Sequence, residues 1–153
     1  MILHTTTTGT DPTGDGTGRW GGQAMEHSGY LDRPDYRVDI LARRNRVTVT
    51  VGDLPLADSV RCLLVDEQDH GLVFYFPPDD VRLDLLTRVD RTSVCPFKGV
   101  ATYRRLVHEG VEVLAWSYPD PHPEVARLGG YLAFYQDVVD LRVGAADPAV
   151  SGR

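Results

Sequence analysis

Short runs of strand-forming residues recur through the middle of this chain, and turn signals separate most of them. Between Arg46 and Val51, apolar and polar residues alternate, so three valines would share one face of a strand. Gly52 and Asp53 then signal a turn. Further runs of this kind span residues 54–59, 61–65, 72–76, 102–109, 111–118, 131–135 and 138–143. No part of this pattern indicates repeated βαβ units.

The pattern predicts a mainly β domain, built as two packed antiparallel sheets or as a partly open barrel, with two short helices. The first helix is expected over residues 79–86, because Asp79 and Asp80 would lie in its first turn, where the helix dipole favours carboxylates. The second is expected over residues 123–128, because a proline opens it and Gly129 follows it.

The two ends differ from the middle in composition. Residues 1–35 are rich in Thr, Gly and Asp, so we expect a flexible N-terminal segment. Residues 36–143 would form the β domain, and residues 144–153 a flexible C-terminal tail. A chain of 153 residues fits about one domain and can bury a core without a disulfide or metal staple.

The overall charge and the apolar pattern indicate which partners to expect. The net charge is −6, whereas nucleic-acid-binding proteins usually present a basic face, so no nucleic acid is expected. The densest basic patch, Arg37 with Arg43, Arg44 and Arg46, is interrupted by acidic residues and is interpreted as a solvated strand edge. No apolar run approaches the ~18 residues of a membrane span, and no secretory signal opens the chain, so a cytoplasmic location without membrane contact is expected.

Lys98 is the only lysine of the chain, beside fifteen arginines. An arginine bias of this kind is typical of GC-rich genomes. The one remaining lysine indicates a position that requires an ammonium on a flexible stem rather than a planar guanidinium.

Cys95 and Lys98, three residues apart after a proline, are the sharpest candidate catalytic pair. On a turn, the ammonium could stabilise the thiolate, which is the nucleophilic form of cysteine. The alternatives are that Cys95 is a buried small apolar residue and that Lys98 binds local carbonyls. Cys62 is the other cysteine, and both are expected to be reduced thiols.

Three carboxylates are candidate acid–base groups. Glu67 is preferred as a catalytic candidate, because it follows a strand. Asp80 needs no role beyond the first turn of a helix, and Asp58 fits a turn.

Aromatic residues provide the candidate binding surface. Trp116 and Tyr118 are two residues apart and would share one strand face. Together with Lys98 they could form an aromatic slot with one charged group, although aromatic residues more often pack a core. The candidate ligand-binding residues are Tyr75, Tyr103, Trp116, Tyr118 and Arg61.

Several of these motifs occur in the order of a known family. They include Leu56-Ala57-Asp58-Ser59, Tyr75-Phe76-Pro77, Cys95-Pro96-Phe97-Lys98-Gly99, Ala115-Trp116-Ser117-Tyr118-Pro119 and Gly130-Tyr131. With this order and spacing, residues 37–142 resemble the domain-of-unknown-function 427 family. The resemblance implies a compact β domain similar to the tent-like fold of two packed sheets, and it implies no established activity.

The family also carries a nucleotidyltransferase label, but the chain lacks the motifs that such chemistry needs. It has no Gly-Ser turn followed by an Asp-x-Asp pair, and no phosphate loop ending in Lys-Ser or Lys-Thr. Tent-like folds often bind zinc through paired Cys-x-x-Cys motifs, and this chain has none. We therefore expect neither a metal nor a cofactor.

Three functions remain open at this stage. The first is a small-molecule pocket, whose enzyme form would use Cys95, Lys98 and Glu67 on a small polar or anionic ligand. The second is a binding module that uses the same aromatic slot without turnover. The third is an interaction domain in which the motif residues only maintain the fold. The sequence does not indicate an oligomeric state.

Overall fold

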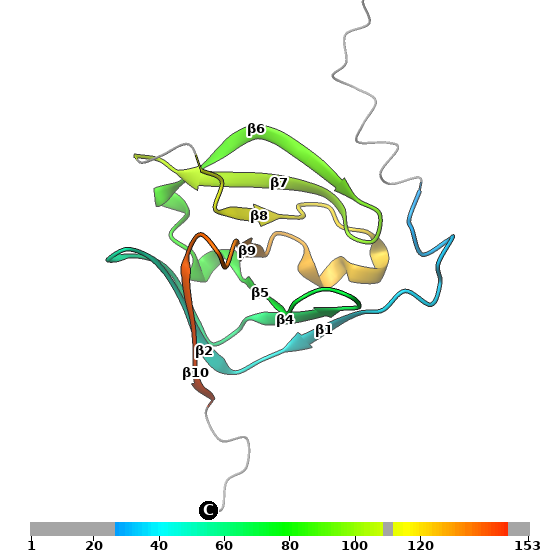
Figure 1. The fold of residues 1–153 in the computed structure, drawn as a ribbon, viewed down its shortest axis with the longest axis horizontal. Helices are drawn as coiled ribbons and strands as arrows, with labels where there is room; N and C mark the ends of the chain where they lie inside the picture. Colours follow the sequence, from blue (N-terminus) through cyan, green and yellow to red (C-terminus); the bar gives the residue numbers. More distant parts are fainter. Residues whose placement is uncertain (1–26, 109–111, 147–153) are drawn as a thin grey trace, which may run out of the picture.

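The computed structural model describes residues 27–108 and 112–146, and these residues form ten strands in two antiparallel sheets (Figure 1). The larger sheet has the strand order β1-β4-β5-β9-β8-β7-β6. Its strands are β1 (Val38–Ala42), β4 (Leu63–Glu67), β5 (Val73–Phe76), β6 (Leu86–Cys95), β7 (Gly99–Leu106), β8 (Ala115–Ser117) and β9 (Leu132–Phe134). The smaller sheet, in the order β10-β2-β3, consists of β2 (Asn45–Val51), β3 (Leu54–Ser59) and β10 (Asp140–Ala146).

The larger sheet curves strongly between its two edges, with β1 at the bottom and β6 at the top of Figure 1. The smaller sheet lies at its left-hand end, and neither sheet closes on itself. The predicted fold class, mainly β with two antiparallel sheets, is confirmed, in its open form. The predicted tails fall mostly on residues 1–26 and 147–153, which lie outside the described residues.

Alternation along the strands gives the larger sheet two apolar faces. On β5, Phe76 belongs to the core that includes Val47 and Val49 of the smaller sheet, whereas Tyr75 belongs to a second core. On β9, Ala133 likewise belongs to the second core. The smaller sheet therefore covers one face of the larger sheet. The opposite face carries the second core.

The two predicted short helices are 3₁₀ turns instead of α-helices. The first region splits into η1 (Pro78–Asp80) and η2 (Leu83–Leu85), because Val81 between them has extended backbone angles and pairs with Ala57 of β3. The Val81 side chain is buried, so pairing and burial outweigh local helix propensity here. The second region is η3 (Pro123–Leu128). None of the helical segments in the described ranges is long and apolar enough to cross a membrane.

Candidate functional site

A cavity of about 290 Å³ opens on the face of the larger sheet that the smaller sheet leaves uncovered. Its walls come from β4, β5, β7, β8 and the turn between β6 and β7. Polar or ionisable groups and aromatic rings line it together. The lining includes Glu67, His70, Cys95 and Lys98, and the aromatic residues Tyr75, Tyr103, Trp116, Tyr118 and Tyr135.

Lys98 reaches this cavity because the chain reverses sharply between β6 and β7. The Lys98 backbone N–H donates to the Cys95 carbonyl at 3.3 Å, and Pro96 provides the fixed φ that such a turn favours. Gly99 follows with φ of +109°, a conformation that residues with side chains rarely adopt, and a Cβ there would meet the Asp120 carbonyl at 3.3 Å. The Cys-Pro-Phe-Lys-Gly motif is thus a turn that places a thiol and an ammonium on one side.

Glu67 comes to the same place by strand alternation. It ends β4 on the face that carries Leu63 and Val65, which belong to the second core. Its Oε2 atom accepts a hydrogen bond from Lys98 Nζ, and the two side chains are only 10% and 8% exposed. The pair is a buried salt bridge with no net charge, and Lys98 keeps further donor capacity after this contact.

Hydroxyl groups add further donors to the cavity. Trp116 donates its Nε1–H to the Tyr75 hydroxyl at 3.2 Å, which leaves the Tyr75 proton available to another acceptor. The Tyr103 hydroxyl is engaged with Ser93 at 2.6 Å, and Arg91 lies 4.5 Å from the centre of the Tyr103 ring. The cavity therefore combines aromatic walls with hydrogen-bond donors.

The Tyr75 and Tyr118 hydroxyls remain protonated at neutral pH. Burial, with a smaller contribution from Tyr75, raises the pKa of Tyr118 well above its ordinary value. Burial also raises the pKa of Tyr75, although the hydrogen bond from Trp116 opposes this. Both groups can therefore donate to a ligand but cannot provide a negative charge at neutral pH.

Sequence reasoning missed two residues at this site. Tyr36, thirty-one residues before Glu67, donates its hydroxyl to Glu67 Oε1 at 3.0 Å. His70 lines the cavity from the loop after β4, and its Nδ1 lies 2.8 Å from the Gln68 carbonyl. No local motif marks either residue, because both reach the site through contacts that depend on the complete fold.

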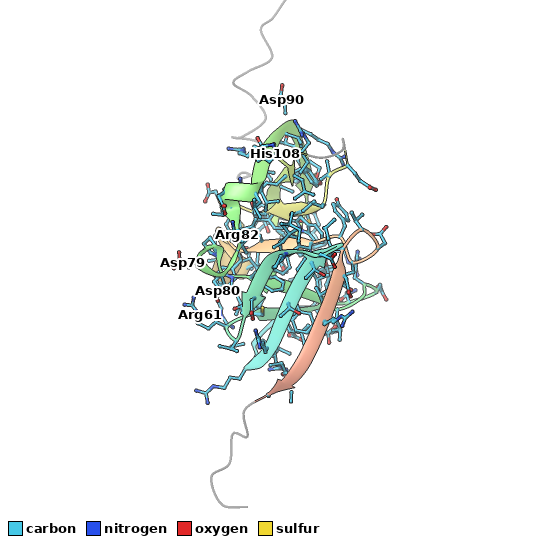
Figure 2. The ribbon with its side chains drawn as sticks, turned by 90° about the vertical axis from the view of Figure 1, so that its left-hand side faces the viewer. Arg61, Asp79, Asp80, Arg82, Asp90 and His108 are labelled. Atoms are coloured by element: carbon cyan, nitrogen blue, oxygen red, sulfur yellow. The ribbon has the colours of Figure 1, made fainter. Side chains whose placement is uncertain are left out.

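Seven of the eight predicted site residues, all except Arg61, line this cavity. Arg61 lies elsewhere and pairs with Asp80 at 2.9 Å, and Figure 2 shows these two side chains beside Asp79 at one edge of the molecule. Ser59 Oγ donates to Asp80 at 2.6 Å, and Cys62 lies buried beneath this group. We call Ser59, Arg61, Cys62 and Asp80 the edge cluster. Asp58, the other carboxylate considered above, pairs with Arg46 on the surface.

Within residues 27–108 and 112–146, no three His, Cys, Asp or Glu side chains come together in a way that could hold a metal ion.

Comparison with known proteins gives the family. The model of a family described as a domain of unknown function, DUF427, matches residues 39–144, which is more than half of the chain. The chain belongs to the DUF427 family. The family prediction made from the sequence motifs is thereby confirmed. All the residues that line the cavity lie within the matched region, whereas Tyr36, which donates to Glu67, precedes it. No curated protein matches the chain.

Proposed function

We propose that this DUF427 protein binds a small planar molecule that carries a hydrogen-bond acceptor such as a carbonyl oxygen. The observation that carries the proposal is that aromatic rings and hydrogen-bond donors line one cavity. Its volume of about 290 Å³ suits a molecule built on about one ring. The reduced thiols expected from the sequence support a cytoplasmic location, since both cysteines are free.

The charge balance of the cavity favours a neutral ligand over an anion. Lys98 is paired with Glu67, so a carboxylate ligand would have to compete with the carboxylate already in place. A carbonyl oxygen can instead accept from a remaining Lys98 proton, or from Tyr75 or Tyr118, without breaking the pair. Of the polar and anionic ligands considered from the sequence, we therefore propose the polar, uncharged one.

The proposal is tested with three probes of similar shape: benzamide, benzoate and benzylamine. The fluorescence of Trp116 reports binding in a Trp20→Phe background, because these are the only tryptophans of the chain. We expect benzamide to bind most tightly, benzoate more weakly and benzylamine least. A Tyr118→Phe variant should weaken benzamide binding by up to about tenfold, the effect of one lost hydrogen bond. Equal affinity for all three probes, or no response to any, would contradict the proposal.

A second candidate function is covalent chemistry, and the position of Cys95 supports it. Cys95 is half-buried and lines the same cavity as Lys98 and Tyr118. A thiol can add to an aldehyde: a bond forms between sulfur and the carbonyl carbon, the C=O π pair moves to oxygen, and the thiol proton is transferred in net to that oxygen. Lys98 or Tyr118 could hydrogen-bond the oxygen during this step.

Benzaldehyde labelled with ¹³C at the carbonyl carbon tests this second candidate. Addition moves the carbon signal from the trigonal to the tetrahedral range, and a Cys95→Ser variant should abolish the change. A Cys62→Ser variant is the matched control and should retain it. If the signal of bound benzaldehyde stays trigonal in the native protein, the pocket only binds its ligand.

A further inference from the structure

A segment before the family match packs against the turn that holds Lys98. We call residues 29–36 the strap. At its start, the Gly29 backbone N–H donates to the Pro96 carbonyl at 2.8 Å, and the Tyr30 ring meets the Phe97 ring edge-on, with centroids 5.2 Å apart. At its end, Tyr36 stacks on the same Phe97 ring, with centroids 3.6 Å apart and an angle of 6°. Two aromatic rings of the strap, Tyr30 and Tyr36, therefore pack against Phe97.

The close fit at Gly29 shows that this packing depends on the residue there. A Cβ at Gly29 would lie 2.8 Å from Phe97 Cε1, closer than real Cβ contacts. The phenyl ring could not simply turn away, because Tyr36 stacks on it. A side chain at position 29 would thus move the strap or the turn.

The strap also completes the surroundings of Glu67. Lys98 Nζ donates to Oε2 of the carboxylate, and the Tyr36 hydroxyl donates to Oε1 at 3.0 Å. Both oxygens are therefore occupied, which holds the carboxylate in one orientation against Lys98. Burial and the hydrogen bond to Glu67 raise the pKa of Tyr36 to about 12, so this donor stays protonated at neutral pH.

We propose that Tyr36 is a positioning and specificity-determining residue, which holds Glu67 against Lys98 and thereby keeps the pocket selective for neutral ligands. The selectivity part rests on the proposed function, whereas the positioning part does not. Without the Tyr36 hydroxyl, Glu67 loses one of its two partners and can turn away from Lys98. Lys98 then becomes available to an anionic ligand.

The positioning part is tested through the side chain of Lys98. Because Lys98 is the only lysine, protein labelled with ¹³C,¹⁵N-lysine gives one set of lysine side-chain NMR signals. Tyr36→Phe keeps the ring that stacks on Phe97 and removes only the hydroxyl. We expect it to shift the Lys98 Cε and Nζ signals. Tyr30→Phe is the matched control, since Tyr30 contacts Phe97 from the same strap, whereas the two hydrogen bonds described for Glu67 come from Tyr36 and Lys98. Lys98 signals that are unchanged in Tyr36→Phe would overturn the proposal.

The selectivity part is tested with benzamide and benzoate. We expect Tyr36→Phe to change the ratio of their affinities about tenfold in favour of benzoate, the size expected for one hydrogen bond to a charged group. Tyr30→Phe should leave the ratio unchanged. If both probes bind and the ratio is the same in wild type and Tyr36→Phe, Tyr36 does not set selectivity. If neither probe binds the wild-type protein, the proposed function fails, and the Lys98 signals alone decide whether Tyr36 positions Glu67.

A second variant tests the strap without removing any hydrogen-bond donor. Gly29→Ala places a methyl group against Phe97 and should displace the strap, so that the Lys98 signals move in the same direction as in Tyr36→Phe. The double variant Gly29→Ala/Tyr36→Phe should then show little additional change, because both substitutions remove the same contact. Fully additive shifts would contradict an effect that passes through the strap.

Discussion

The cavity and the edge cluster contain the same four kinds of group in opposite arrangements. Each has a thiol, a carboxylate, a cation and a hydroxyl. At the cavity, Cys95, Glu67 and Lys98 belong to the lining and Tyr36 donates to Glu67 from the strap; the ion pair is buried and the thiol is half-buried. In the edge cluster, the Arg61 and Asp80 side chains are 59% and 22% exposed, while Cys62 is fully buried. Composition alone therefore does not distinguish the two regions, whereas the burial of their groups does.

Burial decides which group in each region is available for chemistry. In the edge cluster, burial raises the pKa of the Cys62 thiol to about 11, although a hydrogen bond with Ser59 opposes this. We therefore expect that thiol to be unreactive in the folded protein, whereas the Arg61–Asp80 ion pair is screened by water. In the cavity, the ion pair is shielded from water, and the thiol lines the space that a ligand would fill.

The largest expected difference between the two regions is in stability. Lys98→Met leaves the Glu67 carboxylate buried beside an apolar group, so we expect the free energy of unfolding to fall by about 3–5 kcal/mol. Adding Glu67→Gln should recover part of this loss, because it removes the unpaired charge. Urea unfolding at pH 7 measures both. Arg61→Met is the control from the edge cluster and should have a far smaller effect, since its guanidinium lies in water. If Lys98→Met and Arg61→Met lowered the free energy of unfolding equally, burial would not distinguish the two ion pairs.

The next difference is in thiol reactivity. Iodoacetamide should alkylate Cys95 in the folded protein at least about 100-fold faster than Cys62, because Cys62 reacts only after a local opening that costs roughly 3 kcal/mol. Mass spectrometry of the single-thiol variants Cys62→Ser and Cys95→Ser gives the two rates. In urea the two rates should become similar, and comparable rates in the native state would show that Cys95 is not preferentially accessible.

The smallest expected effect is a pH dependence in the edge cluster. Burial would raise the pKa of Asp80, but hydrogen bonds from Ser59 and Arg61 outweigh it and hold the pKa below the ordinary value of 3.8. A carboxylate whose pKa is lower in the folded than in the unfolded protein stabilises the fold. This stabilisation is fully present above the pKa of the unfolded state and is lost as the pH falls through the pKa of the folded state. We expect Asp80→Asn to cost about 1 kcal/mol at pH 7, after allowance for solvent screening.

That cost should shrink as the pH falls below about 4, because Asp80 is then protonated in the wild type as well. Urea unfolding between pH 3 and pH 7 would show the two stability curves approaching each other. A difference that stays constant across this range would mean that the charge of Asp80 does not stabilise the fold.

Local patterns predicted the parts of this molecule that local forces determine. The alternating valines of β2 mark a strand with one buried face, and Val47 and Val49 are fully buried. The spacing of Trp116 and Tyr118 put both on one face, and both line the cavity. The tent-like class was implied by the family resemblance, and two of the motifs that carry the resemblance lie in a strand and a turn: Tyr75-Phe76 in β5, and Cys95 to Gly99 at the reversal between β6 and β7.

Long-range contacts determine the parts that could not be predicted. Residues 79–86 have the composition of a short helix, but Val81 pairs with β3. Strand β6 was missed, because it is an edge strand that is mostly exposed and shows no clear alternation of apolar residues. Tyr36 reaches Glu67 only because β1 pairs with β4 and brings the strap alongside the turn at Phe97.

A crystal structure of the protein soaked with benzamide would test the central claim most directly. The account predicts the ring between the aromatic walls of the cavity, with the carbonyl oxygen within hydrogen-bonding distance of Lys98, Tyr75 or Tyr118, and with the Glu67–Lys98 pair intact. Benzamide bound at the edge cluster with the cavity empty, or a ligand that separates Lys98 from Glu67, would contradict it.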